Sequence, residues 1–195
     1  MGKIYLIMGK SASGKDTIYQ KVRERNKKLL SYVAYTTRPM RDGETEGVEY
    51  HFVNPERIER AREEGRLIES RTYSTVYGPW TYATIDDGQI DASRGDYLVP
   101  GTLESYISLR DYFGPEMVYP IYVEVEDGLR LKRAIAREEK QEVPKYAEMC
   151  RRFLTDSEDF SEEKLKAAGI TRRFENNSLE ECVNEIVECI AGSSR

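Results

Sequence analysis

The first part of the chain combines three successive hydrophobic and polar patterns. Residues 3–8 form a short, largely apolar run between two glycines, which is typical of a strand buried on both faces of a parallel sheet. Residues 9–14 hold two glycines among small residues and predict a loop. From Lys15 onward, apolar residues recur at near-helical spacing, at Ile18, Val22, Leu29 and Leu30. The order is therefore strand, glycine-rich loop and amphipathic helix.

The middle of the chain, residues 32–87, has shorter elements. A helix is expected to begin at Asn54-Pro55, because proline suits the first helical turn, and to stop at Gly65. Three short apolar pieces predict strands, at residues 32–36, 50–53 and 67–69. We therefore expect a small inserted α+β region here.

The second half alternates strands with helices. Apolar runs predict strands at residues 97–99 and 118–125, with a helix over residues 103–113 between them. Two strongly charged helices follow, at residues 129–140 and 145–159; they are too polar for a core and are expected to form a mobile lid. The end predicts a strand at 171–174, a capping box at 178–181 and a helix with the apolar stripe Leu179, Cys182, Val183, Ile186, Val187 and Ile190.

This alternation predicts a three-layer α/β fold built on a mainly parallel sheet. The length of 195 residues fits one domain. We expect its core to comprise residues 1–31, 88–128 and 160–195, with the inserted region at 32–87 and the lid at about 129–159.

Composition narrows the class of protein. Hydrophobic residues make up 39% and charged residues 33%, which excludes a disordered or low-complexity chain. The net charge of −5 argues against nucleic acid or an anionic membrane as the main partner. Three cysteines without metal-ligand spacing and a single histidine favour a reducing compartment and no zinc site. We expect a cytoplasmic monomer or homodimer, since no apolar run is long enough for a membrane span or a signal peptide.

The glycine loop carries the first chemical motif. Gly9-Lys-Ser-Ala-Ser-Gly14-Lys15 has the Gly-x4-Gly-Lys spacing of a phosphate-binding loop, in the required place between a buried strand and a helix. Its backbone N–H groups and the helix N-terminus favour an anion, and Lys15 can reach the β- and γ-phosphates of a nucleotide. The usual Ser or Thr after the lysine is replaced by Asp16, followed by Thr17. We predict binding of a nucleoside triphosphate with Mg²⁺, although the loop alone does not choose among kinases, GTPases and ATPases. The predicted contacts are Gly9, Ser11, Ala12, Ser13, Gly14, Lys15, Asp16 and Thr17.

A second motif begins at Thr36-Thr37 and contains Arg38 and Arg41. Two arginines three apart with a proline between them are not a helical pair, so an extended backbone can direct both guanidinium groups at one anion. Tyr50 adds a hydroxyl donor from a nearby strand. The motif fits a monophosphate clamp; on spacing alone, two solvated surface arginines are the alternative.

These motifs, in this order, resemble the guanylate kinases, which transfer a phosphoryl group from ATP to GMP. The resemblance covers the phosphate loop, the Thr-Thr-Arg-x-x-Arg-x-Gly-Glu block, Gly-x-x-Tyr-x-Phe, Leu67-Ile68-Glu69 and Tyr77-Gly78. It implies that Arg38, Arg41, Tyr50 and Tyr77 lie at the GMP phosphate and that Glu69 accepts hydrogen bonds from the guanine N1–H and 2-amino groups. Thr37 is also predicted to bind the acceptor. It further implies catalytic lid arginines at Arg133, Arg137 and Arg151 or Arg152, and an asparagine near the adenine at Asn176.

The chain also departs from that family. Ala34 stands where a serine usually donates to guanine O6, and Pro79-Trp80 replaces a Ser or Thr whose hydroxyl Thr81 could supply. Residues 98–101 lack the acidic residues often found there, and Asp16 returns a carboxylate near the metal, which we interpret as an exchange of Mg²⁺ ligands. Two alternatives stay open: a related kinase with another acceptor, such as a different nucleoside monophosphate or a ribose bisphosphate, and a non-catalytic module that binds protein partners.

Overall fold

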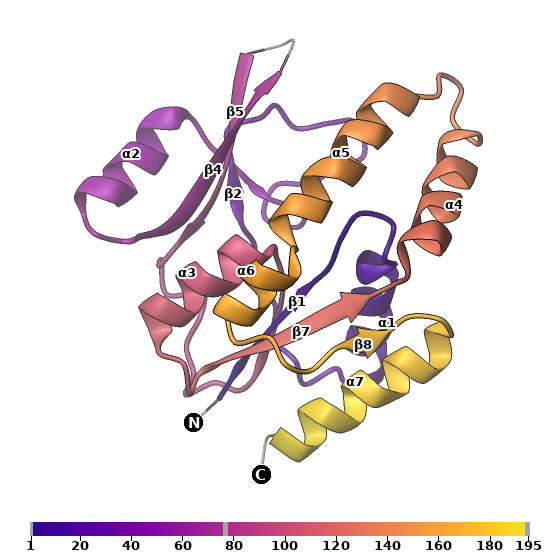
Figure 1. The fold of residues 1–195 in the computed structure, drawn as a ribbon. Coiled ribbons are helices and arrows are strands. Elements are labelled where there is room, and N and C mark those ends of the chain that lie inside the picture. Colours follow the sequence, from indigo (N-terminus) through magenta and orange to yellow (C-terminus); the bar gives the residue numbers. More distant parts are fainter. Residues whose placement is uncertain (1, 76–77, 194–195) are drawn as a thin grey trace.

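The computed structural model describes residues 2–75 and 78–193 and contains two sheets (Figure 1). The core sheet has the order β6-β1-β7-β8, and all of its pairings are parallel. Its strands are β1 (Ile4–Met8), β6 (Tyr97–Pro100), β7 (Val118–Glu124) and β8 (Phe174–Glu175). A mainly parallel α/β fold, as the sequence predicts, is confirmed.

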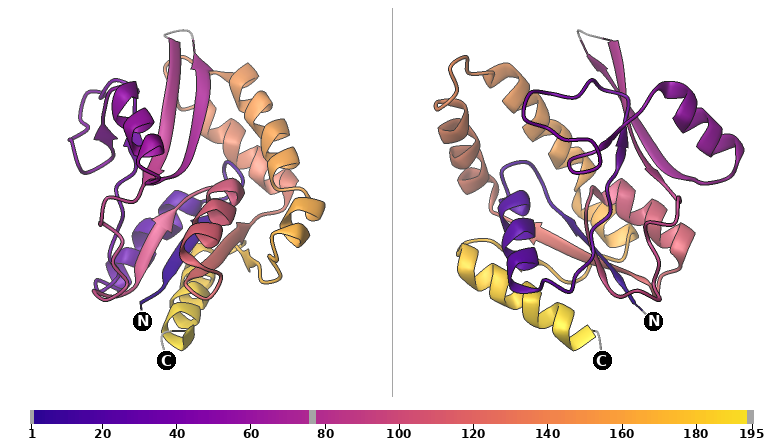
Figure 2. Two further views of the ribbon diagram at one scale, coloured as in Figure 1. Left: turned by 90° about the vertical axis from the view of Figure 1, so that its left-hand side faces the viewer. Right: turned by 180° about the vertical axis from the view of Figure 1, so that it is seen from behind.

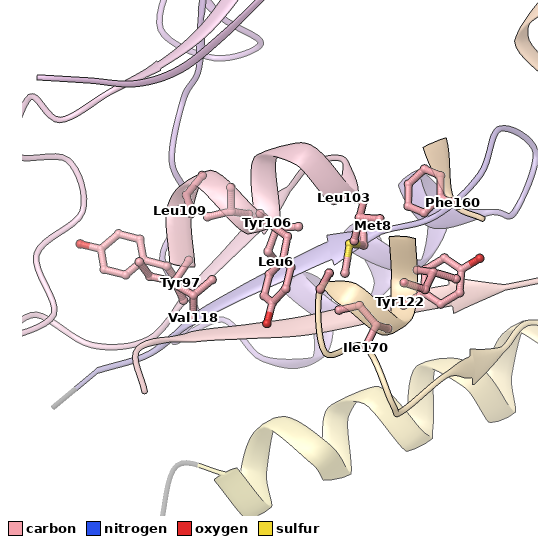
Figure 3. Packing of buried hydrophobic residues seen from close by; sticks show 14 of the residues in the cluster. Leu6, Met8, Tyr97, Leu103, Tyr106, Leu109, Val118, Tyr122, Phe160 and Ile170 are labelled. Carbon is pink, nitrogen blue, oxygen red and sulfur yellow. The ribbon is translucent and has the colours of Figure 1, made fainter. Parts of the chain in front are cut away.

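Strand β1 is buried on both faces, and its side chains divide between two hydrophobic clusters. Ile4, Leu6 and Met8 belong to one cluster, together with residues of α3 (Leu103–Phe113) and α6 (Glu162–Ala167). Figure 3 shows Leu6 and Met8 of that cluster beneath the α3 residues. Tyr5 and Ile7 point to the other face, where α1 (Lys15–Arg25) and α7 (Leu179–Ser193) cover the sheet. The two-residue period of the strand thus builds three layers.

The second sheet lies beside the first and has the order β3-β2-β5-β4. Strands β4 (Leu67–Thr75) and β5 (Gly78–Ile85) are antiparallel; β2 (Tyr35–Thr36) pairs with β5 and, in parallel, with β3 (His51–Phe52). Helix α2 (Pro55–Glu63) packs Ile58 and Ala61 on this sheet, against Tyr35, Ala83 and Ile85. The Asn54 side chain caps it by accepting from the Arg57 N–H at 3.1 Å.

Helices α4 (Asp127–Glu138) and α5 (Tyr146–Asp159) form an arm that faces the β4–β5 hairpin across the phosphate loop (Figures 1 and 2). The loop between β1 and α1 lies at the carboxyl end of the parallel strands, where ligands bind in open α/β sheets. Within the described part of the chain, no helix combines the length and the apolar character needed to cross a membrane.

Several predicted boundaries were wrong. The first helix ends at Arg25; Leu29 and Leu30 follow it in a segment where Leu30 bridges to Tyr97 of β6. The strand predicted at 32–36 is only Tyr35–Thr36, since those two residues alone find strand partners there.

Other elements were also misjudged. The strand predicted at 67–69 continues to Thr75, because β5 pairs along its whole length, and β5 itself was not predicted behind the Gly78-Pro79 start. The strand at 171–174 shrinks to Phe174–Glu175, which pair with Val123 and Glu124. The six-residue helix α6 is too short to give a clear periodicity.

Candidate active site

The phosphate loop has the backbone shape that its glycines predict. Gly14 has a φ of +86°, a left-handed conformation that side chains rarely adopt. A Cβ at Gly14 would also lie 2.4 Å from Asn176 Nδ2, and one at Gly9 would lie 2.6 Å from the Val123 carbonyl oxygen. Both glycines are therefore needed for the chain to approach its neighbours. Ala12 also has a positive φ, of 63°.

Asn176 and Arg133 support this loop from behind. The Asn176 amide donates to the Ser13 carbonyl at 2.8 Å, and both groups are buried. Arg133 Nη2 donates to the Asn176 carbonyl at 3.0 Å. Two residues predicted for nucleotide contact thus form a chain of hydrogen bonds that ends on the loop backbone.

Helices α4 and α5 hold the other side of the loop through Ser11. The Ser11 N–H donates to Asp156 Oδ2 at 2.7 Å, and Arg152 Nη2 donates to Ser11 Oγ at 3.0 Å. Arg130 Nη1 donates to the Ser11 carbonyl at 3.2 Å. The residues of the predicted lid therefore contact the phosphate loop directly.

Arg130 is completely buried, with 0% of its surface exposed. Its guanidinium lies over the Phe153 ring at 4.1 Å, 2.9 Å from Asp127 and 3.4 Å from Asp156. A buried charge requires such partners, because it has lost its hydration. Arg130 therefore ties α4, α5 and the loop together. Burial alone would raise the pKa of the Asp127 carboxyl, but the hydrogen bond and charge of Arg130 outweigh it and hold that pKa below its ordinary value.

A cavity of about 440 Å³ opens between the phosphate loop, the arm and the segment that joins β2 to β3 and carries Arg41. Five cationic and two acidic side chains line it, so it favours an anion despite the negative net charge of the chain. The cations are Arg41, Arg130, Arg137, Lys145 and Arg152, and the acids are Glu138 and Glu148. Arg151 lies outside the lining and pairs with Glu148 through two hydrogen bonds, at 2.8 and 2.6 Å.

The two arginines of the predicted clamp have different surroundings. Arg38 is buried and donates to both oxygens of Glu44, at 2.7 and 2.5 Å. Arg41 is exposed, and its guanidinium forms no hydrogen bond or ion pair within residues 2–75 and 78–193. Only its N–H is engaged, by Glu44 at 2.8 Å. Arg41 therefore offers the free guanidinium at the cavity, whereas Arg38 is committed to shaping the turn.

Tyr50 and the two predicted threonines lie around this turn. The Tyr50 ring stands 5.2 Å from the Arg38 guanidinium, and burial raises the pKa of its hydroxyl. Thr37 Oγ1 accepts from the Thr81 N–H at 2.9 Å, while the Thr81 hydroxyl lies 2.8 Å from that of Thr72. Tyr77, also predicted to bind the acceptor, lies outside the described residues.

Glu69 lies on β4 and accepts hydroxyl hydrogen bonds from Ser105 and Thr84, at 2.9 and 3.1 Å. Burial raises the pKa of its carboxyl. The Ala34 side chain packs against the core cluster that includes Leu6, and as a methyl group it has no hydrogen to donate to a base.

Mg²⁺ usually keeps several waters and takes only one or two protein carboxylates beside phosphate oxygens. Asp16, whose side chain is 91% exposed, lies 2.5 Å from Lys15 Nζ in the first turn of α1, and Thr17 follows it on the exposed surface. No group of three metal-binding side chains occurs among the described residues. One carboxylate and one hydroxyl suit a cation that is held largely by a nucleotide.

Sequence reasoning missed Asp156, Lys145, Ser105 and Thr84. Each meets its partner only in the folded chain: Asp156 and Ser11 are 145 positions apart, and Ser105 and Glu69 are 36 apart. Glu44 closes the Thr-Thr-Arg-x-x-Arg-x-Gly-Glu block, and an acidic side chain six residues after Arg38 was the available indication of an internal ion pair.

The Arg38–Glu44 pair gives a test by pH. Hydrogen bonds from Arg38 hold the pKa of Glu44 at about 2 in the folded protein, against 4.5 for the free carboxyl. Because the folded pKa is depressed, the pair's contribution to stability is complete above the unfolded value and is lost as the pH falls toward the folded value. Glu44→Gln should lower the urea midpoint of unfolding at about pH 7, and its difference from the parent should shrink toward about pH 3.

Exposed Glu63 of α2 supplies the control, because Glu63→Gln should leave the midpoint unchanged. Parallel pH profiles for Glu44→Gln and the parent would contradict the ion pair.

Comparison with known proteins adds independent information. A family model described as guanylate kinase matches residues 1–89. The guanylate kinases of Frankia casuarinae and Mycolicibacterium paratuberculosis are each 44% identical over 69 and 68 residues; these segments cover 35% of this chain but only 38% and 30% of those proteins. The guanylate kinase of Fusobacterium nucleatum is 27% identical over 206 residues, which cover 97% of this chain and 96% of that protein.

A solved structure supports the fold. The crystal structure of guanylate kinase from Anaplasma phagocytophilum aligns with a TM-score of 0.65 at 20% identity and covers 99% of this chain and 86% of that one. The phosphate loop and the Arg38–Glu44–Arg41 turn agree with these likenesses: the first 89 residues match the guanylate kinase model, and the whole chain is similar in fold to a guanylate kinase.

Proposed function

We propose that this protein transfers a phosphoryl group from ATP to GMP and releases ADP and GDP. The main support is the cavity that Arg41 shares with Ser11 of the phosphate loop and the cations of α4 and α5. Transfer between two nucleotides requires one space in which a donor and an acceptor phosphate meet under compensating positive charge. The names of the relatives agree with this activity.

The donor phosphates would be held by the loop N–H groups, the N-terminus of α1 and Lys15. The acceptor phosphate would be held by Arg41, in a turn that Arg38 and Glu44 keep in shape. Arg137, Lys145 and Arg152 line the space between the two sites and would compensate charge on the transferred group. Arg133 would act through Asn176, which it orients, rather than on the phosphates.

The reaction requires little covalent help from the protein. A phosphate oxygen of the acceptor is already a nucleophile at neutral pH, so the residues position the two groups in line and stabilise charge. Asp16 would help the donor phosphates to hold Mg²⁺, which would supply further charge compensation. The arm covers the loop and excludes water from the phosphates.

A second candidate is a related kinase with another acceptor, either a different nucleoside monophosphate or a ribose bisphosphate. Its support is that the phosphate-binding groups are present, while Ala34 offers no side-chain donor to a base. A non-catalytic module that binds proteins is less consistent with a cation-lined cavity beside a phosphate loop. We also propose a cytoplasmic monomer or homodimer, with residues 32–87 as the acceptor region and about 129–159 as the lid.

The direct test is turnover of ATP with GMP, dGMP, AMP, UMP, CMP and ribose 1,5-bisphosphate. GMP should give the highest kcat/KM, and Lys15→Ala should abolish turnover. The thermal midpoint should be preserved, because the ion pair of Lys15 is with the exposed Asp16 and such pairs contribute little to stability. A faster acceptor other than GMP would favour the second candidate. If Lys15→Ala keeps the full activity of the parent, the assignment of residues 9–15 as a phosphate-binding loop is wrong.

Arg41→Ala should raise KM for GMP about 10- to 100-fold, the equivalent of one charged hydrogen bond to phosphate, and leave KM for ATP unchanged. Arg38→Ala should raise the same KM and also lower the thermal midpoint, because Glu44 loses its partner. Arg60→Ala, on the exposed face of α2, serves as the matched control. Equal changes in KM for both substrates would show that the clamp is wrongly assigned.

Asp16→Asn should raise the Mg²⁺ concentration that gives half-maximal rate and lower kcat. Binding of metal-free ATP, measured by calorimetry, should improve or stay level because a negative charge beside the triphosphate has been removed. The alternative role of Asp16 is to stabilise the first turn of α1 through the helix dipole. An unchanged Mg²⁺ midpoint would leave that helix role as the explanation.

A further inference from the structure

The position of Glu69 depends on an irregularity in the hairpin. Leu67 of β4 lies opposite Ile85 of β5, but Glu69 lies opposite Thr84, so β4 advances two residues while β5 advances one. The additional residue is Ile68, which packs on the core cluster that contains Leu6. A bulge of this kind redirects the side chains that follow it. The bulge therefore brings the Glu69 side chain beside Thr84, on the side of the sheet that faces α3.

Three elements meet at one oxygen of this carboxyl group. Oε1 of Glu69 accepts from the Thr84 hydroxyl of β5 at 3.1 Å and from the Ser105 hydroxyl of α3 at 2.9 Å. Both hydroxyl residues are buried, with 6% and 9% of their surface exposed. Thr102, the cap of α3, fixes Ser105 further by accepting from its N–H at 3.1 Å. The hydroxyl donors thus come from rigid elements rather than from loops.

The second carboxyl oxygen, Oε2, differs from Oε1 in its hydrogen bonding. It accepts no hydrogen bond anywhere within residues 2–75 and 78–193. An ionised carboxyl group only accepts hydrogen bonds, so Oε2 can receive an N–H from a ligand. A protonated carboxyl group would instead present an O–H donor and select the opposite pattern on a base.

The surroundings of Glu69 disfavour the ionised form of its carboxyl group. Burial raises the pKa of the carboxyl, and the nearby Glu104 of α3 raises it further. Arg71 of β4 lowers it, but Arg71 is shared with Glu104 and with Asp159 of α5, at 3.6 and 3.3 Å. The two hydroxyl groups also lower the pKa and donate directly to the carboxyl. They are the contacts that keep this half-buried group an acceptor.

We propose that Ser105 and Thr84 are positioning residues for base selection: by donating to Oε1 of Glu69 they hold Oε2 as an acceptor for a purine that presents an N–H at position 1. This proposal rests on the proposed function, because it places Glu69 in the acceptor site. Guanine carries that N–H, whereas adenine presents an unprotonated ring nitrogen there. Removal of a hydroxyl should weaken the preference for GMP over AMP, and more so at lower pH, where Glu69 gains a proton.

The test compares kcat/KM for GMP with that for AMP as a function of pH, in the parent, Ser105→Ala, Thr84→Val and Thr84→Ser. The two substrates carry the same phosphate, so its own titration cancels in the ratio. The ratio should fall about tenfold at mildly acidic pH in Ser105→Ala and Thr84→Val, as expected for loss of one hydrogen bond to a charged group. Thr84→Ser keeps the hydroxyl and should retain the parent ratio, and KM for ATP should not change in any variant.

Direct titration of Glu69 by ¹³C NMR of its carboxyl carbon provides a readout without turnover. The pKa should be higher in Ser105→Ala and Thr84→Val than in the parent and in Thr84→Ser, because the lost hydroxyl favoured the ionised form. If Ser105→Ala does not fold, the Thr84 pair carries the comparison alone. An unchanged carboxyl titration and an unchanged ratio would overturn the proposal.

Absence of turnover with any purine monophosphate in the parent protein would instead overturn the proposed function. The NMR titration would still be readable in that case, so the two failures are distinguishable. In the Glu69→Gln background, Ser105→Ala should not alter the pH dependence of the ratio, since the titrating group is gone. A persistent pH effect in that background would assign the effect to another group and contradict the proposal.

Discussion

The buried guanidinium of Arg130 is the interaction on which the site depends. It contacts the phosphate loop, two aspartates and an aromatic ring, and it does so with none of its surface exposed. A buried cation is stable only when several partners replace its water, so its neighbours are held in one arrangement. The arm formed by α4 and α5 is therefore fixed next to the phosphate loop, where Arg130 and Asp156 lie.

The part of the arm next to the phosphate loop also places several cationic side chains at the cavity, although the protein as a whole is acidic. The chain carries a net charge of −5, yet most of the charged side chains that line the cavity above the loop are arginine or lysine. Overall charge and local charge thus differ in sign. A local excess of positive charge in a recessed site is sufficient for a small polyanion, and it does not require a basic protein.

The two arginines of the acceptor turn show how tertiary contacts divide residues that look alike in sequence. Arg38 and Arg41 share a motif, but Arg38 is buried against Glu44 while Arg41 keeps an exposed and unpaired guanidinium, as far as the described residues extend. The buried pair shapes the turn, and the exposed arginine is available to a ligand. Glu69 is a comparable case, because its two hydroxyl partners turn an acidic residue on a strand into an oriented acceptor.

Elements that have a local cause could be predicted from the amino-acid sequence. The apolar run between two glycines predicted β1, the loop spacing predicted the strand–loop–helix order, and the helix Leu103–Phe113 was predicted with its observed bounds, because periodicity, caps and backbone freedom act over a few residues. Three features could be seen only in the folded chain: Asp156 and Arg130 contact Ser11, a bulge turns Glu69 toward Ser105, and β5 pairs along β4. These contacts join residues distant along the chain, and no local pattern records which distant partner a side chain will find.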